Sequence, residues 1–208
     1  MNKFCLNLIW LFVFYKLSAI GYTEGIEFSQ IKNAVQDAPR VVEFFSFYCP
    51  HCYNFESIYH VSKMISGKFF KDIKIKLERY HIDFLGPLGS DLTKAWTLAM
   101  VLNIEDKIAL ILFEGIQNKE SINTSADIKA VFINMGIKSE EYDAALNSFI
   151  VRSLVIKQQK AVKDFQLVGV PAIFVNGKYM IHNKYIIGND IIYYANAYSD
   201  IVKFLINK

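Results

Sequence analysis

The chain has few of the residues that mark disordered, collagen-like or disulfide-stapled proteins. Its 208 residues include only 10 glycines, 4 prolines and 3 cysteines, whereas 53% are apolar and 15% are aromatic. A chain of this length and composition can close at least one sizeable hydrophobic core, so we expect one or two folded domains. The composition therefore excludes a disordered chain, a collagen-like chain and a small disulfide scaffold.

An excess of charge of one sign is also missing. The formal net charge is +3 at pH 7, and two of the lysines lie in the first 16 residues, at Lys3 and Lys16. The rest of the chain is close to neutral, so the sequence gives no electrostatic reason to expect a nucleic-acid partner.

The first residues differ from the rest of the chain. An apolar run over residues 4–15 ends at Lys16 and is followed by the small residues Ala19 and Gly21. Twelve helical residues span roughly 18 Å, which is short of the ~30 Å hydrocarbon core of a membrane. We therefore expect residues 1–19 to be a secretory signal peptide, cleaved near Ala19 or two residues later. Because Lys16 lies late for a signal peptide, an uncleaved membrane anchor remains the alternative.

The first third of the remaining chain predicts two strands joined by a helix. Residues 41–47 are β-branched and aromatic, as in a buried strand, and residues 73–80 alternate apolar with polar side chains. Between them, Pro50 suits the first position of a helix that continues towards Gly67. This order predicts a right-handed crossover between two parallel strands.

A helical region follows His81. We expect one helix capped by Ser90, a second over residues 107–117 and a third capped by Ser125. A longer helical stretch should begin at Ser139 and reach Phe165, with a break near Ser153. The interior of this region should include Leu146, Phe149, Ala161 and Phe165.

Strands return near the C-terminus. Residues 172–181 carry apolar arms on either side of Asn176-Gly177, which is a strong hairpin signal. A last helix is expected over residues 190–205, capped by Asn189. Taken together, the pattern predicts one α/β domain that is interrupted by an all-α insertion.

The cysteines point to redox chemistry. Removal of the signal peptide discards Cys5 and leaves one pair, Cys49 and Cys52. A ring this small stabilises a large fold little, so we interpret the pair as a working disulfide of an exported protein. Positions i and i+3 of a first helical turn lie about 5–6 Å apart, within the range that a disulfide bridges.

The expected position of Cys49 predicts whether the pair acts as an oxidant or as a reductant. As the N-cap of a helix, its sulfur would face unpaired amides of His51 and Cys52, while Pro50 lacks an N–H; a protonated His51 would add positive charge. Both effects favour the thiolate, and a stabilised thiolate makes the disulfide a good oxidant. Cys52, which is less exposed, would resolve mixed disulfides. No metal or organic cofactor is needed, because the cysteine pair is the redox group.

Other uses of the pair stay open. A single pair of cysteines could supply half of a zinc site, completed by His60, His81 or His182, although no second cysteine pair follows. Purely structural cysteines are the remaining alternative.

Residues 44–56, FFSFYCPHCYNFE, resemble the active-site segment of the DsbA family of periplasmic thiol:disulfide oxidases. The resemblance continues over residues 91–96, 112–115, 131–134, 141–145 and 169–178, and so covers nearly the whole exported chain. It implies a thioredoxin-like domain over residues 20–82 and 161–208, interrupted by a helical domain over residues 83–160. It also implies a periplasmic protein that acts on reduced exported proteins and is reoxidised by DsbB, a quinone-linked inner-membrane protein. The sequence leaves the oligomeric state open, and a monomer is our default expectation.

The resemblance also assigns roles to the cysteines and the residues around them. Cys49 would be attacked by substrate thiolates and Cys52 would be its resolving partner, with Pro50 and His51 tuning the thiolate. Pro171, after Val170, matches a cis-proline that faces the disulfide and lets an extended substrate pair with nearby backbone. A simple proline at the start of a strand is the alternative.

The same comparison singles out a charged pair. Glu43 matches a family glutamate near the redox centre, and Arg79 stands where the family usually has its lysine partner. Arginine keeps its proton, so the resemblance supports a fixed ion pair and not a proton-releasing partner. Alternatively, both side chains reach solvent at the strand ends. Glu56 resembles another family position and could equally be a solvated helix residue.

Two rival functions remain at this point. A disulfide isomerase or reductase would share the fold but would be kept reduced in the cell. A chaperone that binds unfolded exported chains would not need the cysteines at all.

Overall fold

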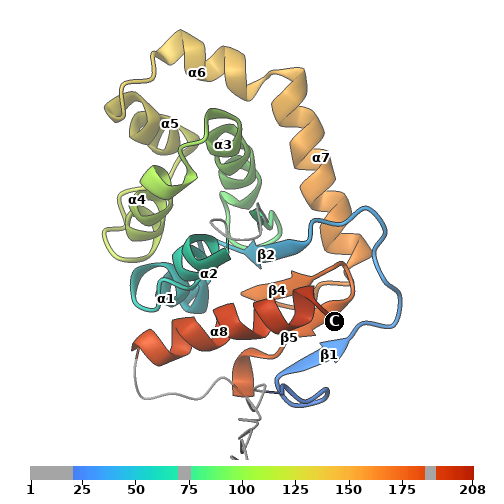
Figure 1. Cartoon of the computed structure of the whole chain (residues 1–208). Helices are drawn as coiled ribbons and strands as arrows, with labels where there is room; N and C mark the ends of the chain where they lie inside the picture. The colour runs from blue at the N-terminus through green and yellow to red at the C-terminus, as the bar shows by residue number, and fades with distance from the viewer. Residues whose placement is uncertain (1–20, 70–75, 186–190) are drawn as a thin grey trace, which may run out of the picture.

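The structure is a computed structural model that describes residues 21–69, 76–185 and 191–208. The predicted signal peptide, the first residues of the strand expected over residues 73–80 and the predicted cap Asn189 lie outside the described residues. Within them, a sheet carries helices on both faces, and further helices form a block beside it (Figure 1).

The sheet in the described part of the chain has the order β1-β5-β4-β2-β3. Its strands are β1 (Phe28–Gln30), β2 (Val41–Phe45), β3 (Leu77–His81), β4 (Ala172–Val175) and β5 (Tyr179–Ile181). Strand β2 pairs parallel with β3, as predicted, and antiparallel with β4. The edge strand β1 pairs with β5 and was not predicted.

The predicted hairpin is confirmed. Strands β4 and β5 pair antiparallel around Asn176 and Gly177, which have φ angles of 54° and 62°. Two left-handed residues in a row give the turn the twist that flanking strands require, and Asn-Gly adopts them at little cost.

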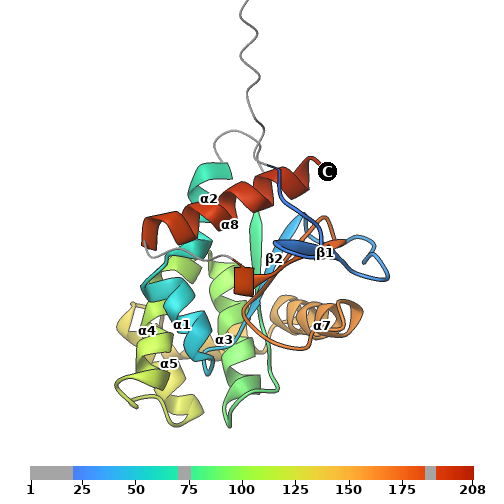
Figure 2. The same ribbon diagram turned by 90° about the horizontal axis from the view of Figure 1, so that it is seen from below.

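One face of the sheet is covered by α1 (Pro50–Ser57), α2 (Val61–Phe69) and α8 (Ile191–Ile206). Figure 2 shows α2 and α8 side by side, and a core that includes Val41, Ile173 and Tyr198 fills the space beneath them. The single helix expected from Pro50 towards Gly67 is therefore wrong. The backbone adopts a left-handed conformation at His60, with φ 51°, which ends the helical path before α2 begins.

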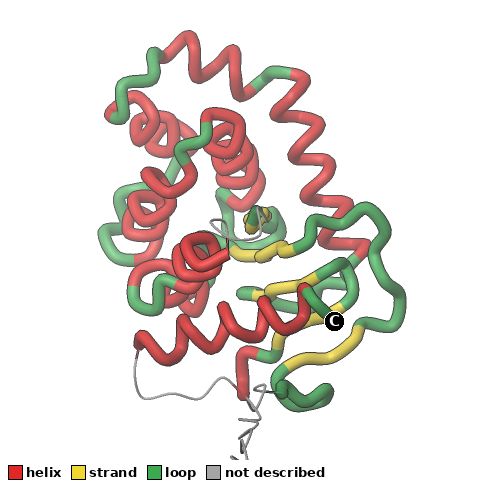
Figure 3. Tube along the Cα trace, viewed as in Figure 1, coloured by secondary structure: helices red, strands yellow, loops and turns green. Residues whose placement is uncertain are grey.

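The inserted helices lie between β3 and β4. They are α3 (Gly89–Leu102), α4 (Glu105–Gln117), α5 (Ser125–Asn134), α6 (Ser139–Leu146) and α7 (Phe149–Asp164). Figure 3 shows them gathered on one side of the strands, while α7 runs back to the sheet. The end of α7 packs Phe165 against Phe44 and Phe174, on the face opposite α8.

Helix starts in this region differ from the prediction by small shifts. The N-cap of α5 is Thr124 and not Ser125, because Thr124 and Asp127 form a reciprocal capping box. The expected break near Ser153 lies instead before α7, where Ser148 accepts a hydrogen bond from the Val151 amide at 3.2 Å. At α3, Leu88 occupies the cap position without a side-chain hydrogen bond, so Ser90 is not the cap.

One predicted core residue is wrong. The Phe149 side chain is 76% exposed, because it is the first residue of α7 and lies on the outside of the block. Leu146 and Ala161 are partly buried, and Phe165 is buried. In the part of the chain that the structure describes, no helix combines the length and apolarity needed to span a membrane.

Candidate active site

Cys49 caps the N-terminus of α1, as the sequence predicted. Its φ and ψ angles of −94° and 113° are extended, and Pro50 occupies the first helical turn. The Cys52 amide donates to Cys49 Sγ at 3.2 Å, and the Cys49 amide donates to the Ser46 carbonyl at 3.0 Å. The sulfur thus lies where the helix has amides without partners. The His51 side chain is exposed, so its fixed contribution comes from its backbone.

The two thiols have opposite environments. Both cysteines are free thiols, with 7% of Cys49 and 2% of Cys52 exposed. A hydrogen bond from the Cys52 thiol, helped by the amides of Cys52 and His51, outweighs burial and lowers the pKa of Cys49 to about 7. Burial, and then the hydrogen bond to Cys49, raise the pKa of Cys52 far above its ordinary value. At neutral pH one sulfur ionises readily and the other keeps its proton.

The loop before β4 lies next to Cys49. The Val170–Pro171 peptide bond is cis, and Cys49 Sγ donates to the Val170 carbonyl at 3.4 Å. The Pro171 carbonyl accepts from Asn183 Nδ2 at 2.6 Å, and Asn183 Oδ1 accepts from the Tyr198 hydroxyl at 2.8 Å. Through Asn183, the loop is anchored to α8.

Two side chains that the sequence analysis did not connect with the active-site turn, Gln117 and His81, hold the segment that leads into Cys49. Gln117, the last residue of α4, donates through Nε2 to the carbonyls of Phe47 at 2.7 Å and of Cys49 at 3.1 Å. The Phe47 amide donates to His81 Nε2 at 3.2 Å. No local pattern marks these residues, because each acts on a turn that is distant in sequence.

Behind the cysteines, Glu43 and Arg79 form a buried ion pair. They lie opposite each other on β2 and β3, with Arg79 Nε 2.9 Å from Glu43 Oε2. Their side chains are 1% and 10% exposed, so the alternative in which both reach solvent is wrong. Ser62 donates to the same Glu43 oxygen at 2.7 Å, and Glu56 lies 2.7 Å from Arg79 Nη2. Glu56 is therefore not merely a solvated helix residue.

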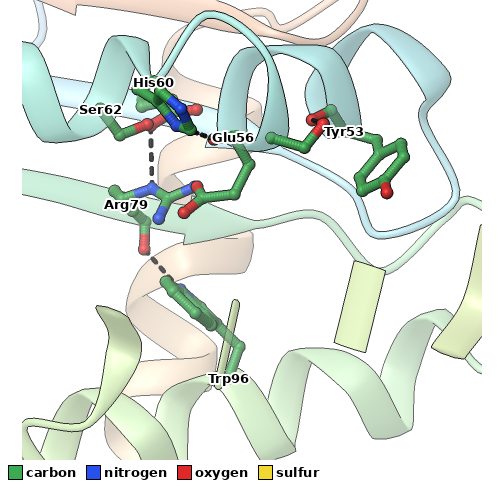
Figure 4. Close-up of polar contacts among 8 residues, drawn as sticks. Tyr53, Glu56, His60, Ser62, Arg79 and Trp96 are labelled. Carbon is green, nitrogen blue, oxygen red and sulfur yellow. Dashed lines mark hydrogen bonds and ion pairs between the residues drawn. The ribbon is translucent and has the colours of Figure 1, made fainter. Parts of the chain in front are cut away.

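The guanidinium of Arg79 contacts two carboxylates and two aromatic rings. Figure 4 shows it between the helices that carry Glu56 and Trp96. Its carbon lies 4.9 Å from the Phe45 ring centre and 5.3 Å from that of Trp96, whose Nε1 donates to the Arg79 carbonyl at 2.8 Å. Burial alone would lower the pKa of Arg79, but Glu43 and Glu56 together raise it. Arg79 is a permanent positive charge here.

The histidines considered for a zinc site have other partners. His60 Nδ1 lies 2.8 Å from the Glu56 carbonyl, and His81 lies between Phe47 and Thr93. Among residues 21–69, 76–185 and 191–208, no group of three His, Cys, Asp or Glu side chains is placed to hold a metal ion.

Known proteins match this chain over its full length. A sequence model for the DSBA-like thioredoxin domain matches residues 40–192. The chain is 46% identical over 208 residues to the thiol:disulfide interchange protein DsbA of Yersinia pestis, with 100% of each chain covered. It is also 46% identical over 209 residues to the DsbA of Escherichia coli, again with 100% of each covered.

Solved structures agree with the sequence match. The crystal structure of DsbA from Proteus mirabilis has a TM-score of 0.86 and 48% identity, and the match covers 90% of this chain and 98% of that one. A complex of Proteus mirabilis DsbA with the non-covalently bound peptide PWATCDS has a TM-score of 0.85 and 47% identity, covering 90% and 100%.

These matches agree with the sheet, the inserted helices and the cysteine pair at the start of α1. Family members use such a pair as their redox group, without a further cofactor. The chain therefore belongs to the DsbA family of periplasmic thiol:disulfide oxidoreductases, with Cys49 and Cys52 as its active-site pair.

Proposed function

We propose that the protein oxidises exported proteins by giving them its Cys49–Cys52 disulfide. The observation that carries this proposal is the position of Cys49 at the start of α1, where hydrogen bonds lower its pKa to about 7. The thiolate exists only in the reduced protein, so its stabilisation favours reduction of the protein and oxidation of the substrate.

The exchange proceeds in two steps. A substrate thiolate attacks Cys49 Sγ, forms a mixed disulfide and breaks the bond to Cys52, whose sulfur takes up a proton. A second substrate thiolate then attacks the substrate sulfur of the mixed disulfide and releases Cys49 as a thiolate. The substrate loses two electrons to the protein, and its two thiol protons go to Cys52 and to solvent. A low pKa at Cys49 makes it a good leaving group in the second step.

Val170 and Pro171 are proposed to bind the substrate backbone. They lie beside Cys49, with the Val170 carbonyl 3.4 Å from its sulfur. An extended peptide placed there would present its cysteine to Cys49 while pairing with the backbone of the loop. The non-covalent complex of the Proteus mirabilis relative with a cysteine-containing peptide supports the binding of a peptide substrate by this chain.

The remaining site residues are proposed to tune the two sulfurs. Pro50 starts the helix whose amides face Cys49, and His51 contributes an amide and an exposed ring. The charge of Glu43 adds to the factors that raise the pKa of Cys52, and Arg79 holds Glu43 in place. This arrangement would keep Cys52 protonated while Cys49 ionises.

The rest of the proposal concerns how the protein is made and recharged. Residues 1–19 direct export and are removed. Residues 20–82 and 161–208 form the thioredoxin-like domain, and residues 83–160 form the helical domain. The protein works as a monomer, and a quinone-linked inner-membrane protein of the DsbB type restores its disulfide. Purification of the mature chain, followed by N-terminal sequencing, checks the cleavage.

A redox titration tests the direction of the reaction. The purified protein is equilibrated with mixtures of reduced and oxidised glutathione, and the fraction of reduced Cys49 is measured. We expect a midpoint more oxidising than that of glutathione itself. A midpoint as low as that of thioredoxin, about −270 mV, would contradict the proposal. Trapping the thiols inside cells adds a second test, because an oxidase is found mostly as the disulfide and an isomerase mostly as the dithiol.

A further inference from the structure

His81 is a buried histidine outside the cysteine motif, yet its ring reaches the turn that leads into Cys49. It is the last residue of β3 and is 1% exposed. Its Nε2 lies 3.2 Å from the Phe47 amide nitrogen, and its Nδ1 lies 2.7 Å from Thr93 Oγ1 on α3. Both ring nitrogens therefore have partners inside the protein.

These partners define which nitrogen carries the proton. The Thr93 hydroxyl donates its one hydrogen to the Gly89 carbonyl at 2.9 Å, so it can only accept from His81. Nδ1 must then be the protonated nitrogen. The Phe47 amide can only donate, and it requires an unprotonated Nε2. Both contacts demand the same neutral tautomer, with the proton on Nδ1.

The surroundings keep the ring neutral and in place. It stacks on Phe47, with ring centres 5.0 Å apart and planes 25° apart, and meets Phe45 edge-on at 5.4 Å. Burial lowers the pKa of His81 to about 3, so the acceptor persists at neutral pH.

The backbone of His81 is also fixed. Its amide donates to Gln158 Oε1 at 3.0 Å, and Gln158 Nε2 donates to Thr97 Oγ1 at 2.6 Å. These bonds join the end of β3 to α3 and α7, so His81 is part of the junction between the sheet and the inserted helices.

We propose that His81 is a positioning residue for disulfide exchange: its bare Nε2 fixes the Phe47 amide and so holds Cys49 at the N-terminus of α1. Gln117 holds the carbonyls of Phe47 and Cys49, and His81 holds the amide side of the same turn. Without the acceptor, a buried amide would be left unpaired and the turn would shift to satisfy it. The N–H groups that stabilise the Cys49 thiolate would then lose their alignment.

The test compares two buried substitutions in one network. His81→Phe keeps an aromatic ring but removes the acceptor, whereas Gln158→Leu removes the bonds to the His81 backbone and to Thr97 and leaves the imidazole intact. We expect His81→Phe to shift the equilibrium with glutathione about three- to tenfold towards a weaker oxidant, and to raise the Cys49 pKa in proportion. Gln158→Leu should destabilise the protein but change that equilibrium less than about twofold.

Equal shifts in both variants, or no shift in His81→Phe, would overturn the inference. If His81→Phe does not fold, nuclear magnetic resonance on the reduced natural chain tests whether His81 Nε2 accepts a hydrogen bond from the Phe47 amide. A scalar coupling between the Phe47 amide nitrogen and His81 Nε2 supports the acceptor role, and a proton on Nε2 contradicts it. The inference rests on the proposed oxidase activity, but the two fail separately: the natural chain's midpoint tests the function, and the ratio between variant and natural chain tests His81.

Discussion

Two sets of polar contacts lie around helix α1, and they differ in whether their strength depends on the charge of Cys49. At its N-terminus, the amides of residues 51 and 52 have the Cys49 sulfur as their acceptor, so their stabilisation depends on the charge of that sulfur. Behind it, Glu43, Glu56 and Arg79 satisfy one another permanently, with Ser62 completing the cluster. Hydrogen bonds that strengthen only when a thiolate forms drive chemistry, whereas charges that are already paired support the fold.

Replacement of the cysteines should give the largest effect on activity. Cys49→Ser removes the sulfur that α1 stabilises, so we expect oxidation of a reduced dithiol peptide to be lost completely. Cys52→Ser keeps the Cys49 thiolate but cannot form the internal disulfide. It should accumulate stable mixed disulfides when given a substrate disulfide, detectable by mass spectrometry. Residual turnover in Cys49→Ser would contradict the assignment of Cys49 as the attacked sulfur.

On the other side of α1, Arg79→Met should have the largest effect on stability. It leaves the buried Glu43 carboxylate without its cation, and breaking such a pair costs about 3–5 kcal/mol of unfolding free energy. Denaturant unfolding measures this loss. The double variant Glu43→Gln, Arg79→Met should recover much of it, because no uncompensated charge remains at Glu43. A stability loss in Arg79→Met below about 1 kcal/mol would show that the cluster is solvated like a surface pair.

The two thiols should also have opposite effects on how the stability of the reduced protein changes with pH. The pKa of Cys49 is lowered to about 7, so its contribution to the reduced protein is absent below that pH and grows until unfolded cysteine ionises near ~8.5. The pKa of Cys52 is raised, so its contribution is lost above ~8.5. The stability of reduced relative to oxidised protein should therefore peak near pH ~8.5. Thermal unfolding of both forms from pH 6 to about 10 checks this, and a monotonic trend would contradict it.

Gln117→Met should have the smallest effect of the substitutions considered. It removes two hydrogen bonds to carbonyls of the active-site turn, on a partly exposed residue, so we expect a loss of about 1 kcal/mol in unfolding free energy. The redox midpoint should move less than in His81→Phe, because Gln117 is partly exposed, so we expect water to take the place of its amide and donate to the two carbonyls. Urea unfolding and the glutathione titration measure both quantities. A larger redox shift than that of His81→Phe would reverse the order of importance within the turn.

Features encoded by neighbouring residues could be predicted from the sequence. The Cys49 cap, the helix that starts at Pro50 and the hairpin at Asn176–Gly177 depend on short patterns, and the structure confirms all three. The break at His60 was missed because a left-handed residue other than glycine leaves no strong local signal.

Contacts between distant elements could not be predicted in this way. The bonds from Gln117 and His81 to the active-site turn join residues that are 70 and 34 positions from Phe47, so neither leaves a spacing to recognise. The Glu43–Arg79 pair was anticipated from family resemblance, while its burial and its third partner Glu56 became visible only in the fold. Phe149 shows the converse error, since a large apolar side chain at the start of a helix can face solvent.

Titration of the Cys49 thiolate tests the central claim most directly. The ultraviolet absorbance of the reduced protein is followed with pH, and the Cys49→Ser variant is used to subtract other groups. The account predicts a transition with an apparent pKa near 7 that belongs to Cys49 alone. A transition near ~8.5, where an ordinary free cysteine titrates, would contradict it, because α1 would then provide no driving force for giving the disulfide away.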